Sequence, residues 1–364
     1  MPAPATVSGR PTVSVIVPAR NEEASLGACL QSLVLQHHLQ DNLRNRVPNN
    51  DVAFEIIVVD DHSTDRTRAI ALSLASPQVQ VIEAGPLPTG WTGKNNAVTA
   101  GARAARGEWL LFTDADTIHL PGSLARSLEE AQRHGATLLS YSPEQIVKSF
   151  CEKAVMPVIF ADLAASFRPS QVSDPNSPAA AANGQYILIT REAYDAIGGH
   201  AAIAGNLLED VALARAVKRS GRKILFRYGG DAVRTRMYRS FAQLREGWTK
   251  NLALLFTSPS RLAALRALEF VLIVASFAIS LVAALHGHRQ PAAVAGTLCV
   301  MLYAFFLMRI RGAHFSWDAN ILAVFGLPLF SYLLLRSKSA HAKGSVRWKG
   351  RTYSDEPCLL ATGN

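Results

Sequence analysis

Long apolar runs are absent from the chain before about residue 262, where apolar residues form only short runs between polar stretches. They gather into long segments between Leu265 and Leu335, which predicts a soluble domain followed by a membrane domain. The first ten residues also lack an apolar stretch of signal-peptide length. We therefore expect the soluble domain to stay in the cytoplasm.

Cysteine is scarce, with four residues in 364 and no paired spacing among them. This excludes a disulfide framework and the usual zinc motifs, and it suits a reducing compartment. The four are expected to be packing residues: Cys29, Cys151, Cys299 and Cys358.

Acidic residues are fewer than basic ones, 28 against 37, which gives a net charge of +9. Much of the excess follows residue 330, beside the apolar segments, and a basic stretch in that place favours anionic lipid head groups. The basic residues of the soluble part do not cluster with aromatic residues, so nucleic acid is not an expected partner.

These patterns predict four regions: a disordered N-terminus (1–11), a soluble domain (12–262), a membrane domain (263–335) and a basic cytoplasmic tail (336–364). The protein is expected to be a multi-pass protein of the inner membrane with its soluble domain in the cytoplasm.

Two segments are long enough to span a bilayer, 267–285 and 292–308. A third, 321–335, would reach only about 22 Å as a helix against a hydrocarbon core of about 30 Å, and Gly326-Leu327-Pro328 interrupts it. A third full crossing would also place the basic tail outside. We therefore predict a re-entrant or interfacial hairpin that leaves the tail in the cytoplasm.

Short β-branched runs followed by helical patterns predict an α/β domain with a Rossmann-like, mostly parallel sheet. The expected strands include 13–17, 55–59 and 79–82, and a helix is expected to open at Asn21. Polar residues follow several strands, and ligands of parallel sheets bind beyond the carboxyl ends of the strands. The residues concerned are Asn21, Asp60, Asp61 and Asp114.

Asp114 and Asp116 follow the apolar run 110–112 and lie one residue apart, so on an extended segment they project to the same side. Paired carboxylates select a hard divalent cation, Mg²⁺ or Mn²⁺, which completes its shell with water and substrate phosphate. A diphosphate-bearing substrate is the natural inference. The alternative is a solvated turn after a strand.

The stretch 90–97, Gly-Trp-Thr-Gly-Lys-Asn-Asn-Ala, lacks the Gly-x-x-x-x-Gly-Lys-Ser/Thr spacing of a phosphate loop, so an NTP-hydrolysing motor is not expected. Amide groups at the start of the following helix, with Lys94 as a point charge, can still face a phosphate or a base. An ordinary surface loop with an extended lysine explains the pattern equally well.

Four segments taken in order resemble successive motifs of the family 2 glycosyltransferases, whose fold is GT-A. They are Pro18-Ala19-Arg20-Asn21-Glu22, Val59-Asp60-Asp61-His62-Ser63-Thr64-Asp65, Gly93-Lys94-Asn95-Asn96-Ala97 and Thr113-Asp114-Ala115-Asp116. The resemblance spans roughly residues 12 to 250. His62 stands where the family usually has glycine.

The resemblance implies a GT-A catalytic domain that binds a nucleotide-sugar with the help of a divalent cation. It assigns the metal to Asp114 and Asp116. It assigns the nucleotide-sugar to Pro18, Ala19, Asn21, Glu22, Asp60, Asp61, Lys94, Asn95 and Asp114.

Glu209 and Asp210 bring an acidic pair to the start of a predicted helix, where capping and the helix dipole alone would favour carboxylates. In the resembling family an acidic pair in this position supplies the general base, and the resemblance carries that role onto Asp210. The chemical need is the proton of an acceptor hydroxyl that attacks the anomeric carbon.

Arg245 and Trp248 partly match the Gln/Arg-x-x-Arg-Trp motif of processive and glucosylceramide-forming relatives. Three residues apart on a helix, they are expected to share a face toward the acceptor or the diphosphate. A membrane-proximal helix with an interfacial tryptophan is the alternative.

Two further segments leave alternatives open. The apolar stretch 150–167, interrupted by charged residues, is either an amphipathic helix on the membrane surface or a core helix. The stretch 169–183, rich in Pro, Ser, Asn and Ala, is either a mobile loop over the site or disordered.

The combined prediction is an inverting glycosyltransferase that moves a sugar from a nucleotide donor, UDP-linked in most of the family, to a membrane lipid. The chain resembles hopanoid-associated and carotenoid glycosyltransferases, and residues 348–353 are similar to a Trp-x-Gly-Arg-x-Tyr ending of lipid glucosyltransferases. A processive polysaccharide synthase is the alternative enzyme, and a non-catalytic nucleotide-sugar-binding membrane protein is the alternative class.

Overall fold

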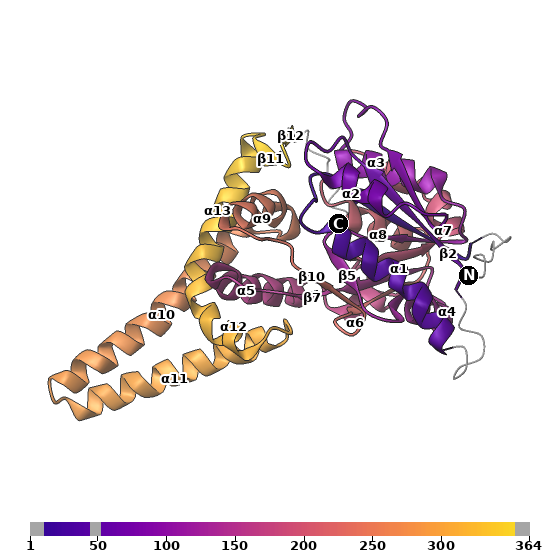
Figure 1. Ribbon diagram of the computed structural model, residues 1–364. Coiled ribbons are helices and arrows are strands. Elements are labelled where there is room, and N and C mark those ends of the chain that lie inside the picture. The colour runs from indigo at the N-terminus through magenta and orange to yellow at the C-terminus, as the bar shows by residue number, and fades with distance from the viewer. Residues whose placement is uncertain (1–10, 44–51, 354–364) are drawn as a thin grey trace. The chain divides into compact units, whose positions relative to one another are not determined.

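The computed structural model describes residues 11–43 and 52–353 (Figure 1). The predicted disordered N-terminus lies almost entirely outside the described residues, as does the end of the predicted tail. Two compact units make up the chain, one from Met1–Gln145 with Phe167–Arg236 and the other from Ile146–Ser166 with Met237–Asn364. The second unit therefore begins well before the predicted boundary at residue 262 and takes one helix from the middle of the catalytic region.

A seven-stranded sheet, in the order β3-β2-β1-β4-β8-β6-β9, forms the centre of the first unit. Every neighbouring pair is parallel except those of β8, which runs antiparallel to β4 and β6. The strands are β1 (Val13–Ala19), β2 (Phe54–Asp60), β3 (Val79–Glu83), β4 (Trp109–Phe112), β6 (Leu138–Ser142), β8 (Ile187–Thr190) and β9 (Ile224–Tyr228). The predicted α/β class with a mostly parallel sheet is confirmed.

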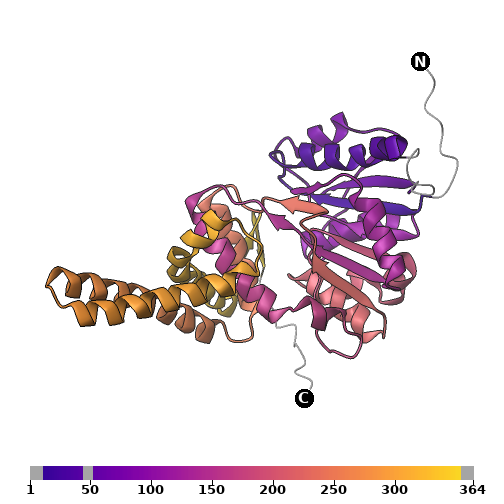
Figure 2. The same cartoon turned by 90° about the horizontal axis from the view of Figure 1, so that it is seen from below.

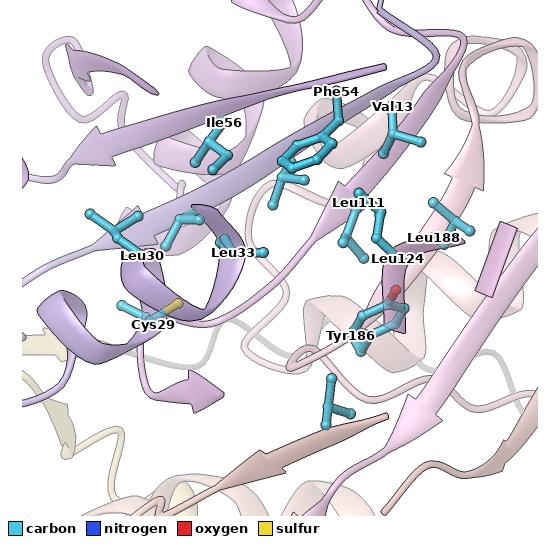
Figure 3. Close-up of a cluster of buried hydrophobic side chains, with 14 of the residues drawn as sticks. Val13, Cys29, Leu30, Leu33, Phe54, Ile56, Leu111, Leu124, Tyr186 and Leu188 are labelled. Carbon is cyan, nitrogen blue, oxygen red and sulfur yellow. The ribbon is translucent and has the colours of Figure 1, made fainter. Parts of the chain in front are cut away.

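Helices cover both faces of this sheet because alternate strand residues point to opposite sides. Val13, Val15 and Val17 of β1 pack with Leu30 and Leu33 of a helix on one face, and Figure 3 shows part of this cluster. Ile16, between them, belongs to a second cluster on the other face. The helices of the unit are α1 (Leu26–Leu43), α2 (Thr67–Ser73), α3 (Gly93–Ala104), α4 (Ser123–Arg133), α6 (Pro169–Ser173), α7 (Arg191–Ala196), the 3₁₀ turn η1 (Gly199–Ile203) and α8 (Glu209–Arg219).

A small sheet of β5 (Thr117–His119), β10 (Val233–Thr235) and β7 (Glu144–Gln145) completes the first unit. Its strand β5 begins directly after Asp116, and the hydroxyl of Thr235 in β10 donates to the carbonyl oxygen of Asp116 at 3.2 Å. This small sheet therefore fixes the backbone that follows the predicted metal-binding pair.

Helices dominate the second unit. They are α5 (Phe150–Ser166), α9 (Phe241–Leu255), α10 (Pro259–Leu285), α11 (Arg289–Arg311), α12 (Trp317–Leu322), the 3₁₀ turn η2 (Ala323–Phe325) and α13 (Gly326–Ala342), followed by the hairpin β11 (Val346–Trp348) and β12 (Arg351–Tyr353). Figures 1 and 2 both show α10 and α11 side by side as a long antiparallel pair. An ionic network joins this pair to α5, since Arg266 and Arg309 both contact Asp162 and Glu269 at 2.7–3.2 Å.

Within the described residues, three helical segments have the length and composition to cross a membrane: Pro259–Leu285, Arg289–Arg311 and Trp317–Ala342. The first two are almost wholly exposed within the unit, with 11% and 6% of their most apolar windows buried, whereas the third is 56% buried. The two predicted spans thus coincide with α10 and α11.

The prediction for the third apolar segment was wrong in its geometry. Residues 317–342 form one continuous helical segment of 26 residues, about 39 Å long at 1.5 Å per residue, and not a hairpin. Pro328 does not interrupt it, because this residue lies in the first turn of α13, where a missing N–H removes no helical hydrogen bond.

Three other local expectations are settled by the structure. The segment 150–167 is a core helix, since α5 buries residues around much of its circumference, among them Val155 and Ile159. The stretch 169–183 contains α6 and the buried Ala180–Ala182, so its residues pack on the first unit. Helix α1 begins at Leu26, not at Asn21, because Asn21 has a positive φ of 53°.

Candidate active site

The carboxyl ends of β1, β2 and β4 meet at one edge of the large sheet. Ala19 pairs with Asp60 in register, and Ile16 pairs with Phe112 two residues before Asp114. Three adjacent strands therefore carry the predicted site residues at or just beyond their carboxyl ends, as the sequence predicted: Pro18, Ala19, Asn21, Glu22, Asp60, Asp61, Asp114 and Asp116.

Two loops at this edge are tied together by Asn21. Its side-chain oxygen accepts a hydrogen bond from the Thr64 amide at 2.8 Å, and its own amide donates to the Ser63 hydroxyl at 3.1 Å. His62 also has a φ of 53°, a conformation that glycine adopts without strain, which explains the glycine usual there. In this chain the His62 ring lies 3.3 Å from Glu83, and this contact holds the ring against β3.

Lys94 connects the end of β4 to the start of α8. Its ammonium nitrogen lies 2.6 Å from Asp114 Oδ1 and 2.6 Å from Glu209 Oε1. Next to it, the amide of Gly184 donates to Asp210 Oδ2 at 3.0 Å. Residues from β4, α3, α8 and the approach to β8 thus converge on one charged cluster.

Burial and neighbouring charges shift the pKa values of two groups in this cluster, Asp210 and Lys94. Burial raises the pKa of Asp210 to about 6, and the neighbouring charge of Glu209 adds to the rise. Burial alone would lower the pKa of Lys94, but the carboxylates of Asp114 and Glu209 outweigh it and raise that pKa well above its ordinary value. Lys94 is therefore a permanent cation, and Asp210 is a carboxyl group poised near neutral pH.

Contacts of Thr113 hold the segment that carries Asp114 and Asp116 in place. The Thr113 hydroxyl donates to the Gln185 carbonyl oxygen at 2.8 Å and lies 3.1 Å from His119 Nε2. Burial lowers the pKa of His119 to about 3, so this ring is neutral. Burial, with Asp116, Asp114 and Glu22 nearby, raises the pKa of the Cys29 thiol and keeps that cysteine an inert packing residue.

Asn95 has a different task from the nucleotide contact predicted for it. The side chain is fully buried, and its amide nitrogen donates to the carbonyl oxygens of Ile203, Ala204 and Asn206 at 2.8–3.1 Å. These carbonyl groups belong to the segment that leads into α8. Asn95 therefore holds the acidic pair in place from behind.

Gly184 is a site residue that sequence reasoning missed. A Cβ atom there would lie 3.0 Å from Lys94 Nζ and 3.2 Å from Glu209 Oε1, so a side chain would crowd the charged cluster. The only signal in the sequence was the Asn183-Gly184 pair before a strand, which turn formation explains on its own.

A divalent cation fits the donor chemistry of Asp114 and Asp116. Their carboxylate oxygens are hard ligands, and a cationic group, the Lys94 ammonium, already lies on Asp114. Within residues 11–43 and 52–353, no group of three or more His, Cys, Asp or Glu side chains is arranged to hold a metal. A cation at this pair would thus need further ligands from water or substrate phosphates, as is usual for Mg²⁺.

Arg245 and Trp248 lie three residues apart in α9 of the second unit, and their side chains differ in exposure. Arg245 is exposed, whereas Trp248 is 2% exposed and its indole N–H points to Met156 Sδ at 3.4 Å. Phe160 and Tyr238 pack edge-on against the same indole. Packing accounts for Trp248, and its catalytic role stays a prediction.

A mostly parallel sheet that ends in paired carboxylates, with an acidic helix start beside them, defines the first unit as a glycosyltransferase domain. Residues 14–192 match the family model described as glycosyl transferase family 2. The resemblance that the sequence motifs predicted is thus confirmed over residues 14–192, which contain all four motifs.

Among curated proteins, the chain is 29% identical to 4,4'-diaponeurosporenoate glycosyltransferase of Staphylococcus aureus strain MRSA252 over 359 residues, 94% of this chain and 88% of that protein. The same enzyme of strain USA300 is 29% identical over 358 residues, with the same two coverages. The similarity thus extends through both units.

Among solved structures, the mannosyltransferase PcManGT from Pyrobaculum calidifontis, in complex with GDP-Man and Mn²⁺, aligns with 92% of this chain and 87% of its own. Its TM-score is 0.47 at 17% identity. The S. aureus protein TarS aligns with 68% of this chain and 39% of its own, with a TM-score of 0.43 and 18% identity.

Proposed function

We propose that the protein transfers a sugar from a UDP-linked nucleotide-sugar to a membrane lipid of the carotenoid, polyisoprenoid or hopanoid type, with inversion at the anomeric carbon. The observation that carries the proposal is the contact of Lys94 with both Asp114 and Glu209. It brings the diphosphate-binding end of the sheet and the acidic pair of α8 within one side-chain length of each other.

The donor's nucleotide would lie over the ends of β1 and β2. Asp60 ends β2 and Asp61 follows it, and their carboxylates can accept hydrogen bonds from ribose and base. Asn21 and Glu22 form the adjoining loop, which is already held to residues 63–67 by hydrogen bonds. A preformed loop lowers the ordering cost of binding the nucleotide.

Asp114 and Asp116 would hold the divalent cation, Mg²⁺ or Mn²⁺. When bound, such a cation neutralises the negative charge of the diphosphate as it leaves. Lys94, as a permanent cation beside Asp114, can donate to the same phosphate oxygens.

Asp210 is the proposed general base. An acceptor hydroxyl loses its proton to Asp210 as its oxygen attacks the anomeric carbon, and the bond to the diphosphate breaks. Direct attack of this kind inverts the anomeric centre without a covalent enzyme intermediate. Glu209 lies 2.6 Å from Lys94, and its charge adds to the effect of burial in raising the pKa of Asp210.

The acceptor assignment draws on the curated relatives, whose name identifies a carotenoid acid, diaponeurosporenoate, and which align over both units. The long apolar pair α10 and α11 supports an acceptor that resides in a membrane. We propose the inner membrane as the location, with α10 and α11 crossing it and the first unit in the cytoplasm.

The proposal is tested with purified full-length protein in detergent. A panel of nucleotide-sugars is incubated with and without Mg²⁺ or Mn²⁺, and release of the nucleoside diphosphate is measured. Lipid extracts of cells with and without the protein are then compared by mass spectrometry. Metal-dependent turnover of one donor and a glycosylated lipid found only with the protein are the expected results. Nucleotide-sugar binding without any turnover would instead favour a non-catalytic binding protein.

A further inference from the structure

Lys94 occupies a position that the proposed cation also requires. Its ammonium nitrogen lies 2.6 Å from Asp114 Oδ1, and Asp114 is one of the two proposed metal ligands. The same nitrogen lies 2.6 Å from Glu209 Oε1. One lysine is therefore shared between a carboxylate of the donor side and a carboxylate beside the general base.

The Lys94 ammonium lies between Asp114, Glu209 and the backbone of Gly184, and we call this position its seat. Glu209 is 9% exposed, and the backbone of Gly184 passes so near that a Cβ there would lie 3.0 Å from Lys94 Nζ. The side chains of Lys94 and Asp114 are 32% and 29% exposed, so the open side of the seat faces solvent. The ammonium can leave this seat without passing through the core.

Lys94 lies on Oδ1 of Asp114, and a divalent cation on either oxygen of this carboxylate would lie within a few ångströms of the ammonium. Like charges at that distance repel strongly where solvent is partly excluded, so a bound cation favours movement of Lys94 away from Asp114. Lysine has a flexible four-carbon stem, and a diphosphate offers it new anionic partners.

We infer that Lys94 holds the place of the metal in the donor-free enzyme: it occupies Asp114 and Glu209, keeps a divalent cation out, and transfers to the diphosphate when the donor arrives. Metal and donor then bind together, each strengthening the other. This inference rests on the metal site of the proposed function.

Lys94→Met tests it through metal binding rather than activity. Binding of Mn²⁺ is measured for the full-length protein in detergent, with and without UDP. The readout is the loss of the electron paramagnetic resonance signal of free Mn²⁺. In the wild type, Mn²⁺ alone should bind weakly and UDP should strengthen the binding. In Lys94→Met, the affinity for Mn²⁺ alone should rise by about tenfold or more, and the strengthening by UDP should shrink.

Gly184→Ala is a second variant that leaves the lysine in the chain. Its added Cβ would lie 3.0 Å from Lys94 Nζ, so the ammonium must shift by a few tenths of an ångström, and Mn²⁺ alone should bind more tightly than in the wild type but less tightly than in Lys94→Met. Lys94→Arg keeps a cation in place and should stay closer to the wild type than Lys94→Met.

The matched controls remove a charge or add a methyl group elsewhere. Arg103→Met removes an exposed cation from the same helix, α3, and Gly85→Ala adds a Cβ that meets nothing within 4 Å. Both should bind Mn²⁺ as the wild type does.

An unchanged affinity of Lys94→Met and Gly184→Ala for Mn²⁺ alone would overturn the inference. If sugar transfer occurs but no form of the protein binds Mn²⁺ even with UDP, the proposed metal site fails and this inference fails with it. If Mn²⁺ and UDP respond as expected but no sugar is transferred, the inference stands and the proposed catalytic activity fails.

Discussion

The hydroxyl of Ser337, near the end of α13, donates a hydrogen bond to the carbonyl oxygen of Thr249 in α9 at 2.7 Å. The amide of Lys349 in the hairpin that follows lies 3.1 Å from Glu246 Oε1 of the same helix. Helix α9 precedes α10 and carries Arg245, Glu246 and Lys250, so it is too polar to lie within the hydrocarbon. A chain that leaves α9 through α10 and returns to α9 must cross a membrane an even number of times.

We therefore predict that α10 and α11 cross and that the segment 317–342 does not. Cysteines introduced at Ser345 and Gln132 should resist a membrane-impermeant maleimide in intact cells, and one introduced at His288, between α10 and α11, should react. All three positions are exposed within their own units. Labelling of the Ser345 position together with that of His288 would show a third crossing.

Asp116→Asn tests the metal assignment. The change removes a ligand charge at almost constant volume, so the protein should fold while sugar transfer falls by on the order of 100-fold or more, since such a cation supplies several kcal/mol. Turnover of the preferred donor and the melting temperature are the two measurements. Near-normal turnover in the folded variant would count against Asp116 as a ligand.

The proposed base gives the reaction a pH dependence. Asp210 accepts a proton only when ionised, and burial with the charge of Glu209 raises its pKa to about 6. Turnover with a hydroxyl acceptor should therefore rise with pH through about 6 and level off above it. Asp210→Asn should remove most of the turnover at every pH.

Glu209→Gln tests whether the charge of Glu209 shifts the acidic limb of that pH profile. Removing the neighbouring negative charge favours ionised Asp210, so its pKa falls and the acidic limb moves to lower pH. The quantity to measure is the pH at which turnover reaches half of its maximum on the acidic side. A limb that stays in place, or moves to higher pH, would show that another group controls it.

Much of the first unit followed from sequence because strand patterns and motif order are local properties. The β-branched run 55–59 lies within a fully buried strand, and the motifs after β1, β2 and β4 share one sheet edge, as topology requires. Glu209 of α8 is joined to these motifs by its contact with Lys94. The two residues are more than a hundred positions apart in the chain, so sequence spacing does not predict this contact.

Sequence patterns do not show the tertiary contacts of a residue. Asn95 lies within a motif that suggests a ligand contact, and its side-chain amide donates to three carbonyl oxygens far along the chain. Trp248 is expected to face the acceptor or the diphosphate, and in the structure it packs against residues of α5. Pro328 reads as a helix breaker, and its position in a first turn removes that effect.

Asn95→Ala should reveal this supporting role. The substitution removes a buried side-chain donor shared by three carbonyl oxygens, of which those of Ile203 and Ala204 keep backbone donors, and it should lower the free energy of unfolding by about 1–3 kcal/mol. Turnover should fall as well, because the segment that precedes Glu209 loses its anchor. Asn96→Ala is the control, since Asn96 donates only to exposed carbonyl oxygens of Gly85 and Pro86. Equal effects of the two substitutions on stability would contradict this role.

Gly326→Ala should disrupt the second unit. Gly326 begins α13 where this helix meets the backbone of α5, and an added Cβ would overlap the carbonyl group of Ala154. Alanine ordinarily favours a helix over glycine by about 1 kcal/mol, so a loss of stability here isolates the steric effect. We expect a loss of about 1–3 kcal/mol or more, because the obstacle is backbone and cannot rotate away. Gly312→Ala, whose Cβ would meet nothing within 4 Å, should leave stability unchanged. Thermal unfolding of the two variants in detergent makes the comparison, and equal melting temperatures would mean that α5 and α13 are not packed this closely.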